Sequence, residues 1–180
     1  TIGGVGVILE PTRPVVHLPN ELIRVYPLRK DQLDDRIRNF PLTNTSHRRH
    51  SVFGFLPLDG ELSPERRTSW VTYDRETTTP YYYSAYLGDT DCFLEFSPAK
   101  KSGIFRVTFS GNQNHYLRLS VLNGNGEIRL HGERQISGEE FFDGMKAYFY
   151  AEINTAVVDS FNKDAANKQT LILSTGNGEQ

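Results

Sequence analysis

The chain has 180 residues, of which 37% are apolar, 12% aromatic and 23% charged, and its formal net charge is −2. This length is sufficient for one globular domain with a hydrophobic core. The slightly acidic balance does not indicate the basic surface that nucleic acid binding requires, and no apolar run is long enough to span a bilayer. We therefore expect no nucleic acid partner and no membrane insertion.

The N-terminal stretch from position 3, GGVGVILEPTRPVVHLPNELIRVYP, is dense in glycine and proline. Short strands are expected at residues 6–9 and 22–26, with Arg13 between two turns. Rigid loops held by a scaffold commonly carry binding residues, so this stretch is a candidate functional loop. The alternative is a purely structural crossover. Because the first residue is Thr1 rather than Met, we expect that the chain has been processed or cut.

Residues 29–40 are the one segment with helical character. Asp31 can serve as an N-cap, and Leu33, Ile37 and Phe40 follow at helical spacing. We therefore predict one helix in an otherwise β-rich chain.

No residues suggest a metal site. Asp31, Asp34 and Asp35 lack the alternating oxygen pattern of a calcium loop, and a helix cap with a solvated face explains them better. His47 and His50 are spaced only loosely like a metal pair, and the arginines between them would repel a cation. The sequence also contains no short catalytic fingerprint such as a phosphate loop or a nucleophile elbow.

Alternation of apolar and polar residues with period two dominates the rest of the chain and predicts strands. The Asn-Gly-Asn-Gly turn at 123–126 predicts a hairpin that joins the strands on either side of it. Residues 162–169 are expected to form a loop, and Glu139 and Glu140 to lie on the surface. The chain is therefore predicted to be all-β, a single antiparallel, supersandwich-like β-sandwich over 1–180. Strands are expected at 51–56, 70–73, 81–87, 92–96, 105–110, 116–121, 128–130, 147–153 and 171–174.

Three consecutive tyrosines begin the strand at 81–87. Successive side chains on a strand point to opposite faces, so we predict that Tyr81 and Tyr83 pack inward. Tyr82 and Tyr86 then line the other surface, which is either more core or a domain interface with Tyr82 at a substrate rim. Cys92, the one cysteine, excludes an internal disulfide and is predicted to be a small buried apolar residue.

The C-terminal end has a predicted strand at 171–174 followed by a turn at 176–178 and no return strand. We expect that the domain is cut at this end, because an edge left that way exposes unpaired backbone groups.

Two further residues have alternative interpretations. Trp70, the only tryptophan, is either part of the core or a platform on which a sugar ring stacks. Glu76, in a threonine-rich segment before the tyrosines, is either a surface residue or an acceptor for a sugar hydroxyl.

Four short motifs resemble the N-terminal domain of glycoside hydrolase family 92, the bacterial exo-acting α-mannosidases often found in gut Bacteroides. That domain typically has a glycine-rich start, a Leu-Pro-Phe-Gly segment, a Glu-x-Ala-x-Pro-Gly-Tyr-Tyr segment and a Gly-x-His-Arg-Tyr-x-Phe segment. The order of the motifs is the same here, with Tyr81 in place of Gly and Phe105 in place of His. The matching residues are Gly3, Gly4, Leu18, Pro19, Glu76, Pro80, Tyr82, Tyr83, Gly103, Arg106 and Phe109.

The resemblance implies a two-domain enzyme that hydrolyses terminal α-mannosides with inversion. In the family the catalytic residues and the calcium ligands come mostly from a C-terminal (α/α)6 barrel, so no catalytic residue and no metal are expected in this chain. The chain alone is expected to be inactive, and the protein to be periplasmic, secreted or at the bacterial cell surface after signal removal. The expected partners are α-mannoside glycans and the barrel of the same polypeptide. The candidate substrate contacts are Gly3, Gly4, Arg13, His17, Trp70, Glu76 and Tyr82.

Two other functions stay open at this point. One is a carbohydrate-binding sandwich without catalysis, and the other is a structural domain that packs on a partner and binds no ligand.

Overall fold

The computed structural model describes residues 16–19, 23–29, 34–44, 51–63, 70–164 and 167–177. Within these ranges the regular elements are β-strands and one short 3₁₀ turn, η1 (Gly88–Thr90), and no α-helix occurs. None of the described segments forms a helix with the length and apolarity needed to cross a bilayer. The predicted all-β sandwich is confirmed.

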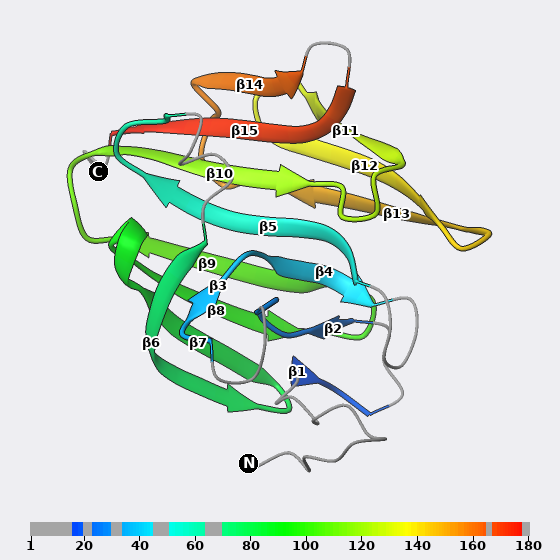
Figure 1. Ribbon diagram of the computed structural model, residues 1–180, viewed down its shortest axis with the longest axis horizontal. Coiled ribbons are helices and arrows are strands. Elements are labelled where there is room, and N and C mark those ends of the chain that lie inside the picture. Colours follow the sequence, from blue (N-terminus) through cyan, green and yellow to red (C-terminus); the bar gives the residue numbers. More distant parts are fainter. Residues whose placement is uncertain are drawn as a thin grey trace.

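The first sheet has five antiparallel strands in the order β3-β6-β7-β8-β9 and forms the lower part of Figure 1. Its last four strands follow one another in the sequence, so each pairs with its neighbour along the chain. The strands are β3 (Arg36–Ile37), β6 (Val71–Thr79), β7 (Tyr82–Leu87), β8 (Cys92–Pro98) and β9 (Gly103–Phe109).

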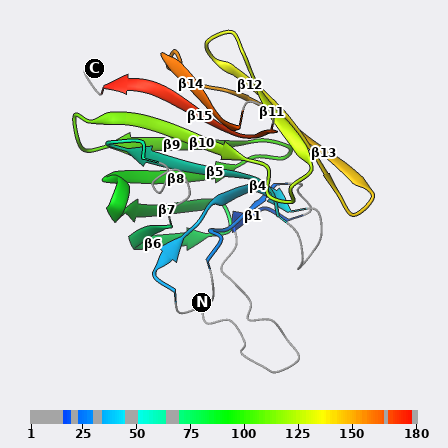
Figure 2. The same cartoon turned by 45° about the horizontal axis from the view of Figure 1, so that its top comes forward.

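The second sheet also has five antiparallel strands but joins distant parts of the chain, in the order β14-β15-β10-β5-β4. Figure 2 shows it stacked on the first sheet. The strands are β4 (Phe40–Asn44), β5 (Ser51–Asp59), β10 (Asn114–Ser120), β14 (Asp159–Asp164) and β15 (Asn167–Asn177).

A third sheet of three strands and a short ribbon complete the described structure. The third sheet, in the order β11-β12-β13, is an antiparallel meander of β11 (Gly126–His131), β12 (Gln135–Phe142) and β13 (Met145–Glu152). The ribbon pairs β1 (Val16–His17) with β2 (Arg24–Val25).

The core lies between the two large sheets and continues under the third. Phe55 of β5 meets Phe105 of β9 with ring centroids 4.9 Å apart, and Phe40 of β4 meets Tyr83 of β7 at 5.5 Å. On the third sheet, the ring of Phe149 packs edge-on against Phe53 at 4.6 Å. Strand β5 is therefore buried on both faces, which explains why its sequence, SVFGFLPLD, is nearly continuously apolar.

Glu140 of β12 fastens the third sheet to the second. Its side chain is buried, and Oε2 accepts the backbone N–H of Phe53 at 2.8 Å. Oε1 accepts the backbone N–H groups of Leu122 at 2.9 Å and Asn123 at 2.6 Å, together with the side-chain amide of Asn123. The prediction that Glu140 lies on the surface is wrong. Backbone N–H groups from two other segments solvate its carboxylate in place of water, so the side chain can be buried.

The predicted helix at 29–40 is absent from the described part of that segment. Leu28 forms a bridge with Asn39, Arg36 and Ile37 form β3, and β4 begins at Phe40. Ile37 and Phe40 are fully buried, but they reach the core from two short strands of different sheets. Asp31 and Leu33 lie outside the described residues.

Two predicted connections are also wrong. The turn at 123–126 does not close a hairpin, because β10 pairs with β5 and β15 while β11 pairs with β12. The predicted loop at 162–169 is occupied by β14 and β15 on either side of residues 165–166. Similarly, β15 continues through Asn177 instead of turning at Gly176. A bulge opposite His115 and Tyr116 accommodates the positive φ of Gly176, +81°.

The tyrosine prediction is correct for three of the four residues. Tyr83 is 1% exposed and faces the core with Ala85 and Leu87, while Tyr82 and Tyr86 lie half-buried on the opposite face. Tyr81 is 63% exposed because it belongs to the turn before β7 and not to the strand. Cys92 is fully buried in β8, as predicted, and burial raises the pKa of its thiol to about 12.

Candidate functional site

A bulge in β6 determines the direction of Glu76. Arg75 has a left-handed backbone, with φ +53°, and its N–H is held by the carboxylate of Asp74 at 2.7 Å. The register shifts by one residue between Asp74 and Thr77. An extra residue reverses the alternation of the strand, so Glu76 comes to the same side of the sheet as the buried Tyr83.

Glu76 lies in a cluster with an arginine and two tyrosines, which we call the Glu76 cluster (Arg29, Tyr73, Glu76 and Tyr83). Arg29 forms an ion pair with Oε1 of Glu76, and their side chains are only 14% and 24% exposed. The hydroxyl of Tyr83 donates to the same oxygen at 3.0 Å. The guanidinium carbon of Arg29 also lies 4.4 Å from the ring centroid of Tyr73, a cation–π contact.

The electrostatics of the cluster keep both tyrosines protonated. Burial raises the pKa of Tyr83 well above its usual range, and the nearby Glu76 carboxylate raises it further. Burial likewise raises the pKa of Tyr73, against the opposing effect of Arg29. Neither phenol can therefore act as a base at neutral pH, and both serve as hydrogen-bond donors or packing groups.

Chemically, the Glu76 cluster is suited to hold a polar ligand and not to transfer a proton. One oxygen of Glu76 already accepts two donors, whereas Arg29 has a buried Nε with no hydrogen-bond partner among the described residues.

Tyr82 belongs to a different constellation on the outer face of the first sheet. Its hydroxyl donates to Glu95 at 2.7 Å, and Arg106 donates to both oxygens of that carboxylate at 2.5 and 2.7 Å. Hydrogen bonds from Arg106 and Tyr82 lower the pKa of Glu95, and the bond to Glu95 raises the pKa of Tyr82. Glu76 and Tyr82 therefore face opposite sides of one sheet, and the structure does not bring them together.

The other predicted contacts are spread along the chain. His17 is exposed on β1 opposite Arg24, and Trp70 is half-buried directly before β6. Trp70 precedes Glu76 by six residues, a distance of about 20 Å along an extended strand. Gly3, Gly4 and Arg13 lie outside the described residues, as do His47 and His50.

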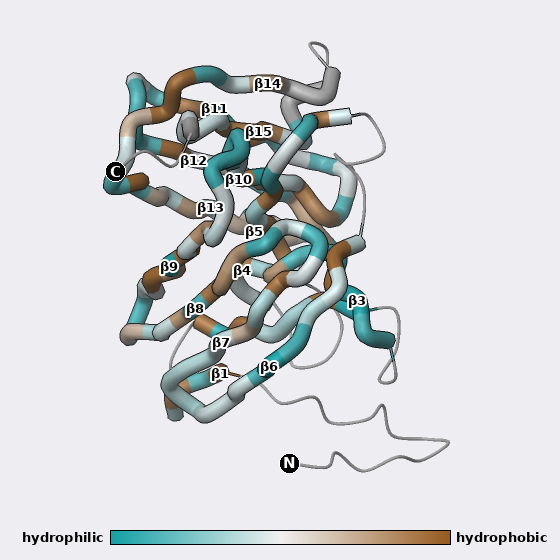
Figure 3. The backbone as a smooth tube through the Cα atoms, turned by 90° about the vertical axis from the view of Figure 1, so that its left-hand side faces the viewer, coloured by the Kyte–Doolittle hydropathy of each residue, from teal (hydrophilic) through white to brown (hydrophobic). Residues whose placement is uncertain are grey.

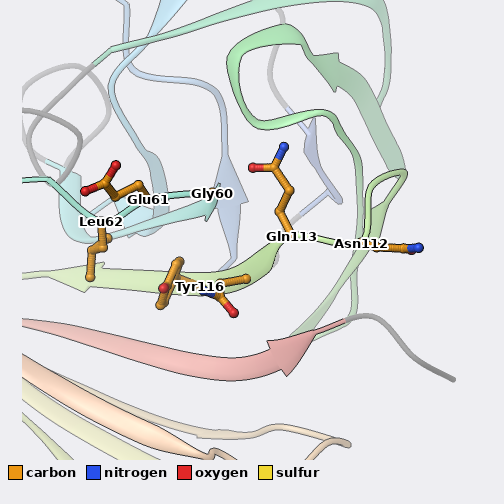
Figure 4. Close-up of a pocket in the computed structure, with 7 residues that line it drawn as sticks. Gly60, Glu61, Leu62, Asn112, Gln113 and Tyr116 are labelled. Atoms are coloured by element: carbon orange, nitrogen blue, oxygen red, sulfur yellow. The ribbon is translucent and has the colours of Figure 1, made fainter.

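A separate shallow pocket of about 370 Å³ lies between the end of β5 and the start of β10 (Figure 4). Its walls offer carboxylate, amide and phenol groups, but no predicted site residue lines it. The lining residues are Gly60, Glu61, Leu62, Asn112, Gln113, Asn114 and Tyr116.

Sequence reasoning missed the partners of the predicted residues. Arg29 was placed in a helix, so its pairing with Glu76, 47 residues away, was not foreseen. The Glu95–Arg106 pair could have been found, because the two residues are directly opposite in the β8–β9 hairpin.

Comparisons with known proteins define the class of the chain. Residues 1–177 match the glycosyl hydrolase family 92 N-terminal domain. The chain belongs to this family. A comparison with curated proteins gave no significant match.

Solved structures of the family share the fold. A family GH92 inverting mannosidase from Bacteroides thetaiotaomicron aligns with a TM-score of 0.78 and 22% identity, covering 91% of this chain and 26% of that one. A family GH92 α-mannosidase from the same organism aligns with a TM-score of 0.70 and 17% identity, covering 91% and 29%. This chain therefore spans less than a third of the length of these relatives.

Proposed function

We propose that this chain is the N-terminal β-sandwich domain of an exo-acting α-mannosidase that removes terminal α-mannosides from glycans. The observation that carries the proposal is the family match over residues 1–177. The similar solved structures, which are named mannosidases, support the substrate class. Residues 1–180 would form the first domain of a two-domain polypeptide whose second domain is a helical (α/α)6 barrel.

In this proposal the barrel performs the chemistry. Inverting hydrolysis requires an acid and a base far enough apart to admit a water molecule. The Glu76 carboxylate does not suit either part, because Arg29 and Tyr83 already occupy one of its oxygens. The domain would instead help to bind and orient the glycan.

Calcium, which the family implies, would be bound by the barrel. The described residues of this chain contain no group of three His, Cys, Asp or Glu side chains placed to hold a metal ion. No step proposed for this domain depends on the metal.

The substrate contacts proposed for this domain need more than one sugar ring. Trp70 precedes β6, whereas Glu76 follows the bulge at Arg75 within that strand. Tyr82 faces the other side of the sheet. The Glu76 cluster is the best supported contact, because it gathers a carboxylate, a guanidinium and two phenols in one place. The proposed contacts are Gly3, Gly4, Arg13, His17, Trp70, Glu76 and Tyr82.

The test compares the whole polypeptide with residues 1–180 by measuring mannose release from α-linked mannobiose. We expect release by the whole protein and none by the isolated domain. Release by the domain alone, or no release by the whole protein, would overturn the proposal. In the whole protein, Glu76→Gln should raise KM more than it lowers kcat, whereas Glu61→Gln, in the separate shallow pocket, should change neither.

The family also suggests where the protein acts. We therefore propose that it acts in the periplasm, at the cell surface or in the medium. Cell fractionation with an antibody against this domain tests that location, and recovery in the cytoplasmic fraction would contradict it.

A further inference from the structure

The third sheet has an outer face on which three large aromatic side chains stay exposed, those of Tyr148 and Tyr150 on β13 and of Phe141 on β12. Tyr148 is 67% exposed and Tyr150 is 63% exposed. They alternate along β13 with Phe149 and Ala151, which pack against the core. The two phenol rings therefore project from the same side of one strand, with about 7 Å between their attachment points.

Polar groups border the two rings on the neighbouring strand. Tyr148 lies directly opposite Glu139 of β12, and Tyr150 lies opposite Ser137. The hydroxyl of Ser137 is hydrogen-bonded to Nε2 of His131 at 2.7 Å. Each ring thus has a carboxylate or a hydroxyl beside it that can hydrogen-bond to a ligand lying on the ring.

Charges of both signs are interleaved on this face. Glu127 and Arg129 form an ion pair on β11, opposite Glu139 and Ser137 of β12. A surface with both signs interleaved does not favour a strongly charged partner such as a nucleic acid. The face is therefore suited to a neutral ligand.

The exposed aromatic area on this face favours a sugar chain over a protein. A tyrosine can bury about 150–250 Å². With both rings already about one-third covered, the pair offers roughly 300 Å². A stable protein interface buries about 800 Å² on each partner. Two rigid rings with hydrogen-bonding neighbours instead match a polyhydroxylated chain, because tyrosines provide large contact area at low entropic cost.

We propose that Tyr148 and Tyr150 form a binding platform for a neutral glycan chain, with pyranose rings stacked on the phenols and sugar hydroxyls bonded to Glu139, Ser137 and His131. The platform lies on a different sheet from the Glu76 cluster. Only the choice of mannose as the sugar rests on the proposed function. A glycan held here would keep a polymeric substrate near the protein between turnovers.

The test is affinity electrophoresis of the chain in native gels containing soluble α-mannan, with dextran gels as a comparison. We expect wild-type protein to be retarded, and Tyr148→Ala/Tyr150→Ala to lose at least tenfold in apparent affinity. Tyr81→Ala is the matched control, because Tyr81 is 63% exposed but lies in the turn before β7. Tyr150→Trp should retain binding, because it keeps an aromatic face.

A second measurement does not depend on any variant folding. When wild-type protein is titrated with α-linked mannotriose and followed by NMR, the largest changes in backbone amide chemical shift should fall in β12 and β13. The proposal would be overturned if neither gel retards the wild-type protein, or if the double variant is retarded as strongly as wild type. It would also be overturned if the largest chemical-shift changes lie outside β12 and β13. Retardation in the dextran gel alone would support a glycan platform but would show that mannose is not the sugar it binds.

Two controls separate this proposal from its alternatives. A wild-type dimer in sedimentation that the double variant abolishes would identify a second copy as the occupant and overturn the proposal. Hydrolysis of α-linked mannobiose by the wild-type whole protein tests the proposed function separately from binding at the platform.

Discussion

Replacement of Glu140 by Gln tests the most consequential contact of the fold. Glu140 is buried, yet no described cation pairs with its carboxylate. Four N–H donors hold it instead: the backbone groups of Phe53, Leu122 and Asn123, and the side-chain amide of Asn123. Phe53 also has a left-handed backbone there, with φ +52°. The variant keeps the shape of the side chain but exchanges one acceptor for a donor.

The cost can be worked out from this geometry. Whichever way the new amide turns, its NH₂ group faces either the Phe53 N–H or the pair from Leu122 and Asn123. A buried donor left unsatisfied costs about 1–3 kcal/mol, and a hydrogen bond to a charged group contributes about 1.5–3 kcal/mol. We therefore expect the free energy of unfolding to fall by about 3 kcal/mol. For a domain of this size that corresponds to a decrease in Tm of about 6–12 °C.

Urea unfolding followed by circular dichroism measures the effect. Glu139→Gln is the matched control, because it makes the same chemical change one position away on the outer face of β12. We expect that control to stay within about 0.5 kcal/mol of wild type. Equal unfolding midpoints for the two variants would refute the assigned role of Glu140.

Three further changes have outcomes that the structure predicts. Tyr83→Phe removes the hydrogen bond to Glu76 and should lower the free energy of unfolding by about 1–2 kcal/mol in urea titrations; an unchanged value would show that the bond contributes nothing. Gly138→Ala would place a Cβ 2.3 Å from Cε1 of Phe149, so we expect a loss of about 1–3 kcal/mol by calorimetry, and a stable variant would contradict that packing. Burial raises the pKa of Cys92 to about 12, whereas a thiol in the unfolded chain titrates near about 8.5. The contribution of the buried, protonated Cys92 thiol to the free energy of unfolding is therefore complete at neutral pH. It is lost as the pH rises from about 9 to about 12. The difference in stability between wild type and Cys92→Ala should shrink across that range, and a constant difference would refute the assignment.

Alternation of side chains predicted which strands exist far better than where they begin. Leu94 and Phe96 of β8 have the burial that period two predicts, as do Tyr83 and Ala85 of β7. Tyr81 has the same parity as Tyr83, yet it precedes the strand. Parity alone does not show where a strand starts, so the prediction for Tyr81 was wrong.

The partners of strands were harder to predict than the strands themselves. The turn at 123–126 has the composition of a hairpin, yet it carries the chain from the second sheet to the third. The contacts that make the difference are the Leu122 and Asn123 N–H groups on Glu140, which comes 17 residues after Asn123. The apolar residues at 37 and 40 likewise fit helical spacing but are buried in separate strands. Local sequence patterns do not predict contacts of this kind between residues far apart in the chain.

The same reasoning applies to the candidate site. Glu76 was singled out from the threonine-rich segment and the family motif, but the bulge that directs it and the arginine that neutralises it were not foreseen. Hydropathy gives little indication of such a site: β6, which carries it, is largely hydrophilic along its length in Figure 3. A motif can identify a residue, whereas its role depends on the contacts that the fold provides.

The order of strands in the second sheet has a consequence for biosynthesis. Strand β10 lies between β5, which precedes it in the chain, and β15, which follows it by about 50 residues. While the ribosome is still making the segment between them, one edge of β10 has no strand to pair with. Its apolar residues Leu117 and Leu119 lie along that open edge. Nascent chains at this stage are the ones most exposed to edge-to-edge association, and the arrival of residues 167–177 ends that exposure.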